Sequence, residues 1–204
     1  MVILVSGASK TLQRLQGHPN LGQLLTPQAG NAIMSGMPYA ADNAAYSNWD
    51  EGKFVRMLDS LVGKSPMWVS VPDVVGKAIA TSRLYDKWWP EINGRGLPVA
   101  LVAQNGQESI GLPPEWKYDC LFIGGDNEFK LGAHVRWLVK KVKSKGKLVH
   151  MGRVNSWRRL CYAYEIGCDS VDGTGFSRFP DTYIPQMIRY LEKPQSNLFY
   201  GEGL

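Results

Sequence analysis

The sequence predicts a compact (β/α)8 barrel of the TIM type, and two observations support this fold class. Short apolar runs alternate along the chain with longer segments of helical period, which is typical of parallel strands joined through right-handed helical crossovers. Eight such runs can be counted in 204 residues, which is close to the lower size limit of this barrel. A flavodoxin-like open sheet is the alternative if two of the expected strands are wrong.

The eight expected strands are short and mostly apolar. Val2–Ser6 opens the series, and Leu21–Leu25 follows within a Gly- and Pro-rich stretch from Gly17 to Pro38. The other expected strands lie at Tyr39–Asp42, Met67–Val71, Pro98–Ala103, Cys120–Ile123, Lys147–His150 and Ser170–Asp172.

Helical period between the strands predicts the outer layer of the barrel. The clearest helix is expected at Glu128–Lys145, where the apolar residues fall on one face at i, i+4, i+7, i+8 and i+11 from Leu131. Further helices are expected at Trp49–Val62, Val75–Trp89, Ser156–Ile166 and Asp181–Leu191. Residues 1–193 are therefore expected to form a single domain, and the polar residues 194–204 a C-terminal tail.

Composition excludes several classes of protein. Hydrophobic residues at 44% and charged residues at 20% exclude a disordered chain or a coiled coil. No apolar run reaches the roughly 18 residues of a membrane span, so no membrane partner is expected. The three cysteines form no CxxC pair, which predicts reduced thiols and a cytoplasmic location, in the host if a phage encodes the chain. The net charge of +5 suits a polyanionic partner.

Polar residues directly follow six of the expected strands, where chemistry collects in parallel α/β folds. Asp42, Asp73 and Asp172 stand at three of these strand ends, and a fourth carries a Gly-Gly pair that can bring backbone N–H groups against a ligand. One such aspartate alone is as often the N-cap of the next helix, but six polar strand ends in order favour a shared site. They are Asp42-Asn43, Pro72-Asp73, Gln104-Asn105, Gly124-Gly125-Asp126, His150–Arg153 and Asp172-Gly173.

This ordered set resembles the tRNA-guanine transglycosylase family, whose barrel exchanges guanine for a 7-deazaguanine base. The similarity runs from about Tyr39 to Arg178, most of the chain, and Asp73 matches the family's second aspartate. The family motifs TDSGG, VQG, IGGL, LMGVG and GVDxFDCV resemble, in that order, the segments Ala41–Ala45, Val102–Gly106, Ile123–Gly125, Val149–Arg153 and Gly167–Thr174.

Two departures narrow the resemblance. The family's zinc site, built from three cysteines and a histidine, has no counterpart after Asp172, and the chain is much shorter than a tRNA enzyme. Both features resemble the short phage-type branch that inserts 7-deazaguanines, such as 7-cyano-7-deazaguanine, into DNA. The resemblance implies a pentosyltransferase without metal or cofactor. Its partners would be the free 7-deazaguanine base and a flipped or single-stranded guanine in DNA. The oligomeric state is open, because the missing zinc subdomain is the family's dimer element.

The resemblance also implies roles for single residues. Asp172 would be the nucleophile of a double displacement at C1′, and Asp42 the general acid and base. Asp73 would accept N1–H and N2–H of guanine, while Gln104 and the Gly125 N–H donate to O6. The other base-binding residues would be Asn43, Gly124, Met151 and Gly152. Stacking on the base is open to Tyr39, Tyr46, Trp49 and Met151, of which at least two are expected to be core residues.

Arginines that follow strand ends are expected to contact phosphates. These are Arg153, Arg158, Arg159 and Arg178. The lysine run from Lys140 to Lys147 lies at a helix C-terminus, on the opposite face of the barrel, where complementing the helix dipole is favoured over DNA contact. His150 either points into the site or is a packed, hydrogen-bonded core residue.

Three other functions stay open at this point. One is an RNA or tRNA base-exchange enzyme without the zinc arm, another is a non-catalytic nucleic-acid-binding barrel subunit, and the third is a small glycosidase or phosphate-sugar enzyme. The three aspartates disfavour a pure scaffold, and Gln104 with the Gly-Gly pair favours base recognition over sugar hydrolysis. All of these inferences require Asp42, Asp73 and Asp172 to converge on one pocket.

Overall fold

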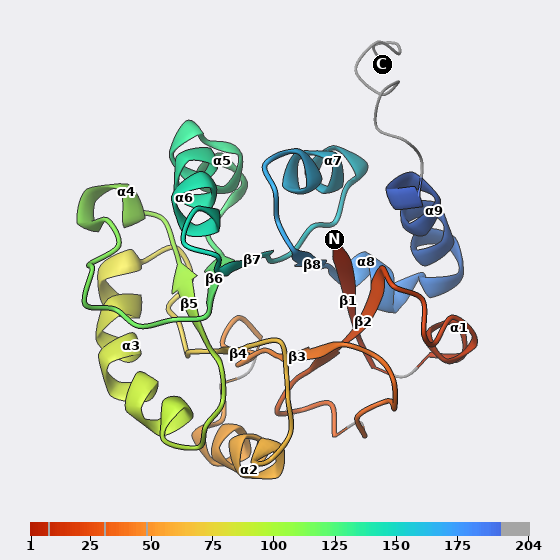
Figure 1. The fold of residues 1–204 in the computed structure, drawn as a ribbon, viewed down its shortest axis with the longest axis horizontal. Coiled ribbons are helices and arrows are strands. Elements are labelled where there is room, and N and C mark those ends of the chain that lie inside the picture. The colour runs from red at the N-terminus through yellow and green to blue at the C-terminus, as the bar shows by residue number, and fades with distance from the viewer. Residues whose placement is uncertain (8, 31, 48, 193–204) are drawn as a thin grey trace.

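The computed structural model describes residues 1–192 apart from 8, 31 and 48, and in it eight parallel strands close into a barrel (Figure 1). Each strand pairs with its neighbours in sequence, and β1 closes the ring by pairing with β8. The strands are β1 Val2–Ser6, β2 Leu21–Leu25, β3 Tyr39–Ala41, β4 Val69–Ser70, β5 Val99–Ala103, β6 Cys120–Ile123, β7 Leu148–Met151 and β8 Ser170–Asp172. The predicted (β/α)8 barrel is confirmed, and closure excludes the open flavodoxin-like sheet.

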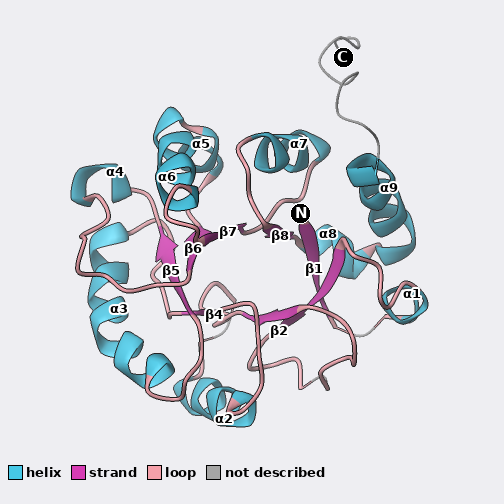
Figure 2. Ribbon diagram, in the orientation of Figure 1, coloured by secondary structure: helices cyan, strands magenta, loops and turns pink. Residues whose placement is uncertain are grey.

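Helices form a ring outside the strands (Figure 2). They are α1 Lys10–Arg14, α2 Glu51–Leu61, α3 Ala78–Asn93, α4 Gln107–Ile110, α5 Asn127–Leu131, α6 Ala133–Lys143, α7 Trp157–Glu165, α8 Thr174–Arg178 and α9 Pro180–Glu192. The short helices α1, α4 and α8 were not predicted, because four or five residues are too few to show a periodic pattern.

The helix expected at Glu128–Lys145 is instead two helices, α5 and α6, separated at Gly132. The backbone of Gly132 is extended, with φ −72° and ψ 157°, and its N–H donates to the Phe129 carbonyl at 3.1 Å. The apolar face remains continuous across the break because Val135, Leu138 and Val139 of α6 are fully buried. The interruption therefore leaves the packing of this layer intact.

The connection from β2 to β3, residues 26–38, contains no helix in its described part. Figure 2 shows loops at this place in the ring, between α1 and α2. The Gly- and Pro-rich composition of the segment accounts for this, because both residue types disfavour a helix interior.

The inside of the barrel is filled by side chains. One buried cluster faces the interior and consists of Leu4, Leu24, Ala40, Trp68, Ala100 and Cys120. The Trp68 ring makes an edge contact with Phe122 at 5.5 Å between centroids and lies 4.6 Å from the His150 ring. A second, larger cluster packs the outer faces of the strands against the helices. The aromatic side chains therefore form a packed floor beneath the carboxyl-terminal end of the barrel.

Other expectations concern the tail, the membrane and the cysteines. The expected tail, residues 194–204, lies outside the described residues. In the part of the chain that the structure describes, no helix combines the length and the apolar character that crossing a membrane requires. Cys120, Cys161 and Cys168 are all free thiols.

Candidate active site

Three aspartates from different strand ends line one cavity at the carboxyl-terminal end of the barrel. Asp42 follows β3, Asp73 lies three residues after β4, and Asp172 ends β8. The cavity has a volume of about 60 Å³. Its remaining lining residues are Asn43, Tyr46, Val75, Gln104, Phe122, Gly124, Lys130, Gly152 and Arg153. The convergence that the sequence hypothesis requires is therefore present.

Asp42 lies in an environment that favours its protonated form. The Ser70 hydroxyl donates to Asp42 Oδ1 at 3.0 Å and itself accepts the Asn43 backbone N–H at 2.9 Å. Burial, and then the charges of Asp172 and Asp73, raise the pKa of Asp42 to about 7. Burial also raises the pKa of Asp73. A carboxyl group that titrates near neutral pH can both give and take a proton, as a general acid and base must.

Hydrogen bonds fix the Asp172 carboxylate through one of its two oxygens. Oδ1 lies 3.1 Å from His150 Nε2 and accepts the Arg153 backbone N–H at 3.0 Å. His150 is fully buried, its Nδ1 lies 2.9 Å from Ser170 Oγ, and burial lowers the pKa of the imidazole. A neutral ring whose Nδ1 accepts from Ser170 carries its proton on Nε2 and donates it to Asp172. Oδ2 of Asp172 receives no hydrogen bond from the described residues, so this oxygen is available to a ligand.

Arg153 supports this site through an unusual backbone conformation. Its φ is 56°, in the left-handed region that non-glycine residues rarely adopt and that costs about 1–2 kcal/mol. In this conformation the Arg153 backbone N–H donates its hydrogen bond to Asp172. Its guanidinium donates to the Gly125 carbonyl at 2.6 Å and lies 4.4 Å from the Tyr46 ring centroid. Arg153 therefore connects Asp172 to Tyr46 at the edge of the cavity.

Asp73 is fixed by two amide side chains. Gln104 Nε2 donates to its Oδ2 at 2.6 Å, and Asn43 Nδ2 donates to its Oδ1 at 3.0 Å. Gln104 Oε1 accepts the backbone N–H groups of Gly76 at 2.9 Å and Gly125 at 2.7 Å. The expected donation of the Gly125 N–H to a base oxygen is therefore not available in this structure, because Gln104 occupies that N–H. The second hydrogen on Gln104 Nε2 is still available as a donor.

Gly124 and Gly152 line the cavity at positions that exclude any side chain. A Cβ on Gly124 would lie 2.5 Å from Gln104 Nε2, and one on Gly152 would lie 2.6 Å from the Phe122 ring. Both positions were predicted as base-binding, and both bring bare backbone to the cavity wall.

Met151, one of the expected base-binding residues, lies elsewhere. It is fully buried in the cluster between strands and helices and does not line the cavity. Side chains alternate along a strand, and His150 points into the barrel, so Met151 points outward. Tyr39 packs against the same outer cluster, and Trp49 packs against the Phe54 ring at 5.3 Å. Tyr46 is the one stacking candidate that lines the cavity.

Lys130 lines the cavity and was not predicted. It is 1% exposed, and its Nζ donates to the Gly152 carbonyl at 2.7 Å. Burial, followed by the charge of Arg153, lowers the pKa of Lys130 to about 8. A lysine in a helical segment is normally read as a solvent-exposed residue. One feature of the sequence could have indicated this position. The helix α5 starts only two residues after the Gly124-Gly125 strand end, so its residues lie close to the site.

A larger cleft of about 640 Å³ adjoins the cavity. Four residues line both spaces, namely Tyr46, Val75, Lys130 and Arg153. Arg159 and Arg178 line the cleft as well, and Arg159 donates to the Arg153 carbonyl at 2.9 Å. The structure thus brings three of the four expected phosphate-binding arginines together, whereas Arg158 is exposed and does not line the cleft.

The lysines at the end of α6 have local partners. Lys143 pairs with Asp169 at 2.6 Å, Lys141 lies 4.7 Å from the Trp137 ring, and Lys147 lies 4.8 Å from the Tyr118 ring. None of them lines the cavity or the adjoining cleft. These contacts agree with the surface role that the sequence favours for this run.

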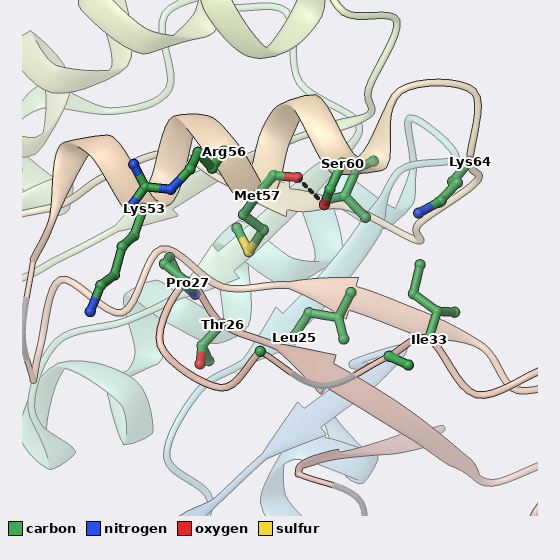
Figure 3. A pocket seen from close by; sticks show the side chains of 12 residues that line it. Leu25, Thr26, Pro27, Ile33, Lys53, Arg56, Met57, Ser60 and Lys64 are labelled. Atoms are coloured by element: carbon green, nitrogen blue, oxygen red, sulfur yellow. Dashed lines mark hydrogen bonds between the residues drawn. The ribbon is translucent and has the colours of Figure 1, made fainter.

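A separate groove of about 300 Å³ lies on the outer wall, between α2 and the β2–β3 connection. Figure 3 shows Lys53 and Met57 of α2 on one side of it and Thr26 and Pro27 on the other. It shares no lining residue with the aspartate cavity. The groove is therefore distinct from the candidate active site.

Comparison with known proteins identifies the fold and no family. No protein-family model matches the chain, and no curated protein does either. Phosphoribosyl anthranilate isomerase from Thermus thermophilus is similar in structure, with a TM-score of 0.51, 14% identity and coverage of 94% of this chain and 96% of that one. The HpcH/HpaI aldolase from Desulfitobacterium hafniense has a TM-score of 0.48 and 11% identity, with coverage of 96% and 95%.

A third comparison covers only part of the other protein. The chain spans 37% of the Klebsiella pneumoniae BlrP1 chain from a manganese/cy-diGMP complex, with a TM-score of 0.42 and 15% identity. At sequence identities this low, structural similarity indicates a shared fold but not a shared chemistry. What the chain shares with the Thermus thermophilus isomerase is the TIM-type (β/α)8 barrel.

Proposed function

We propose that this protein is a DNA-guanine transglycosylase, which exchanges guanine in DNA for a 7-deazaguanine such as 7-cyano-7-deazaguanine. The observation that carries the proposal is the convergence of Asp42, Asp73 and Asp172 on one cavity that adjoins an arginine-lined cleft. Base exchange needs a nucleophile, an acid and base, and a carboxylate that recognises the base. The three aspartates have three different sets of partners, one suited to each task.

The reaction is a double displacement at C1′ of the nucleotide. Asp172 Oδ2 forms a bond to C1′ while the C1′–N9 bond breaks, and Asp42 gives its proton to the departing guanine. The ionised Asp42 then takes the N9 proton of the incoming base. That nitrogen attacks C1′ and releases the Asp172 carboxylate, so two inversions retain the configuration. A pKa of about 7 suits Asp42 to both proton transfers.

Guanine recognition rests on Asp73 and Gln104. The Asp73 carboxylate accepts N1–H and N2–H of the base, while the free hydrogen on Gln104 Nε2 donates to O6. Adenine differs from guanine in two ways: it has an amino donor in place of O6, and its N1 carries no proton. Bound adenine would therefore leave the Asp73 carboxylate and the Gln104 amide without hydrogen bonds to the base. Because both groups are buried, this mismatch would select strongly against adenine.

The mouth of the cavity is formed by Tyr46 and Arg153, which lie against each other. The inner cavity of about 60 Å³ is smaller than the several hundred Å³ of ordinary small-molecule sites. A bound base must therefore extend into the cleft or displace this pair. Tyr46 is 68% exposed and free to move onto the face of a base.

The nucleic acid would lie along the cleft. A base stacked in a duplex cannot present C1′ to Asp172, so the substrate nucleotide is flipped out or single-stranded. Arg153, Arg159 and Arg178 line the same cleft and supply positive charge for the flanking phosphates. DNA is proposed over RNA on the resemblance to the short branch without the zinc subdomain.

The test is base exchange on defined nucleic acids. The protein is incubated with duplex DNA, single-stranded DNA or tRNA, each with 7-cyano-7-deazaguanine, and the products are digested to nucleosides for mass spectrometry. A 7-deazaguanine deoxynucleoside from DNA, absent with Asp172→Asn, is the expected result. A modified ribonucleoside from tRNA alone would reassign the substrate to RNA. No exchange on any of the three would overturn the proposal.

A further inference from the structure

The starting observation is an ammonium group with unused donors beside the three aspartates. Lys130 is 1% exposed, and among the described residues its Nζ has one hydrogen-bond acceptor, the Gly152 carbonyl at 2.7 Å. An ammonium carries three hydrogens, so two of them lack a protein acceptor. Buried lysines are normally paired, because an unpaired buried charge is costly. Since Lys130 lines the cavity, a ligand there can accept the remaining hydrogens.

The order of the strands predicts which edge of a bound base meets Lys130. Asp73 follows β4, Gln104 follows β5, Lys130 lies on α5 after β6, and Asp172 ends β8. Around the rim of a guanine-like base the order is N1 and N2, then O6, then position 7, then N9. With N1 at Asp73, O6 at Gln104 and N9 toward Asp172, position 7 faces the sector between β5 and β8. Lys130 lies in that sector.

The charges around Lys130 make this corner of the cavity positive. The charges of Arg153 and Arg159 lower the pKa of Lys130, whereas the charges of Asp172 and Asp126 raise it. Asp126 is exposed at the cleft and screened by water. Asp172 is an uncharged ester at the moment when the incoming base binds, since it then holds C1′. The carboxylates that are ionised at that moment, Asp42 and Asp73, face N9 and the N1 edge of the base in this arrangement, whereas a positive group on position 7 would lie toward the cations Lys130 and Arg153.

We propose, on the basis of the transglycosylase function above, that Lys130 selects incoming 7-deazaguanines whose position-7 substituent accepts hydrogen bonds and carries no positive charge. A nitrile or a carboxylate on position 7 takes the free hydrogens of the Lys130 ammonium. An aminomethyl group, which is protonated at neutral pH, is repelled by it. Lys130 thus decides among bases that are identical on their Watson–Crick edge.

The test compares three bases that differ only at position 7: the nitrile, the carboxylate and the aminomethyl compound. Each is offered to the wild-type protein at pH 7 with DNA that contains labelled guanine, and kcat/KM is taken from the release of label. The aminomethyl base is expected to react at least about ten-fold less efficiently than the other two, because like charges in a buried site repel strongly. Exchange of labelled for unlabelled guanine reports the proposed function itself, because guanine has no substituent on that atom.

Variants locate the selectivity at Lys130. Lys130→Met is expected to bring the three efficiencies within about three-fold of one another, and Lys130→Glu to favour the aminomethyl base. Lys140→Met, at the far end of α6, is the matched control and should keep the wild-type preference. If the Lys130 variants fail to fold, the wild-type comparison still tests the order of preference, and equal use of the three bases would overturn the proposal.

The outcomes separate the two proposals. Guanine–guanine exchange with equal use of the three bases overturns the role of Lys130 and leaves the transglycosylase standing. The same holds if Lys130→Met weakens DNA binding without changing the order of preference, which would assign Lys130 to a phosphate. No exchange of guanine at all overturns both.

Discussion

The Nε2 atom of His150 lies 3.1 Å from Oδ1 of Asp172, from a position under the carboxylate and inside the barrel. His150 is fully buried between the Trp68 and Phe122 rings and does not line the cavity. In the proposed reaction it would act through Asp172, as a positioning residue. Its hydrogen bond holds Oδ1, and Oδ2 is the oxygen that would form the bond to C1′ in the proposed reaction.

Loss of this hydrogen bond should slow the chemical step and leave substrate binding unchanged. His150→Leu is expected to lower kcat by about ten- to one-hundred-fold, with KM changed less than three-fold, because it frees the nucleophile to rotate. His150→Gln retains a donor and should recover part of kcat. The measurement is single-turnover release of labelled guanine. An equal loss in both variants would point to a packing defect in the barrel core.

Asp42 should make the free energy of unfolding depend on pH. An unfolded carboxyl titrates near 3.8, whereas in the folded protein the pKa of Asp42 is about 7. Between these values the folded state holds a proton that the unfolded chain has released, so stability falls as the pH rises from about 4 to 7. Asp42→Asn removes this dependence and should be more stable than wild type at pH 8 by up to about 4 kcal/mol.

Denaturant unfolding of both proteins from pH 4 to pH 8 measures this difference. A stability gain of Asp42→Asn that is as large at pH 4 as at pH 8 would contradict the raised pKa. The same titration predicts that guanine release by the wild type declines above pH 7, because Asp42 loses the proton that the departing base needs. Asp42→Asn should be inactive throughout.

Asp172→Asn should abolish base exchange while DNA affinity stays within about two-fold of wild type. The amide is nearly isosteric, but it is too weak a nucleophile to hold C1′. Trapping is the sharper measurement, because the wild type should form a covalent protein–DNA adduct that survives denaturing electrophoresis when no second base is supplied. An adduct that persists in Asp172→Asn would assign the nucleophile to another residue.

Arg178 and Arg158 offer a matched pair for the nucleic-acid contact. Both are exposed arginines, but Arg178 lines the cleft and Arg158 does not. Arg178→Ala should weaken DNA binding and reduce the slope of log K against log salt by about one, as the loss of one phosphate contact does. Arg158→Ala should leave both nearly unchanged. Identical salt slopes for the two variants would place the DNA outside this cleft.

The barrel was predictable because its strands are short, mostly apolar runs, six of which are directly followed by polar residues. Leu21–Leu25, set within a Gly- and Pro-rich stretch, proved to be a strand with the expected bounds. The break at Gly132 was not predicted, since the apolar face continues through it. The short helices α1, α4 and α8 left no periodic signal to read.

The convergence of the aspartates followed from the rule that the carboxyl ends of parallel strands share one end of a barrel. The details that failed depend on side-chain direction. Met151 was assigned to the base although alternation with the inward-pointing His150 turns it outward. The Gly125 N–H is occupied because the Gln104 side chain folds over it, which no local pattern encodes. Lys130 escaped notice because helical lysines are usually solvated.

The packed floor of Trp68, Phe122 and His150 closes the barrel from beneath, so the cavity opens away from the barrel interior, on the side of the adjoining cleft. If the protein exchanges bases as proposed, a departing guanine would leave through this cleft, by which its replacement also arrives. In the proposed reaction the two bases would then occupy the cavity one after the other, with the sugar held on Asp172 in between. Free guanine in the surroundings would then compete in that cleft with every incoming base.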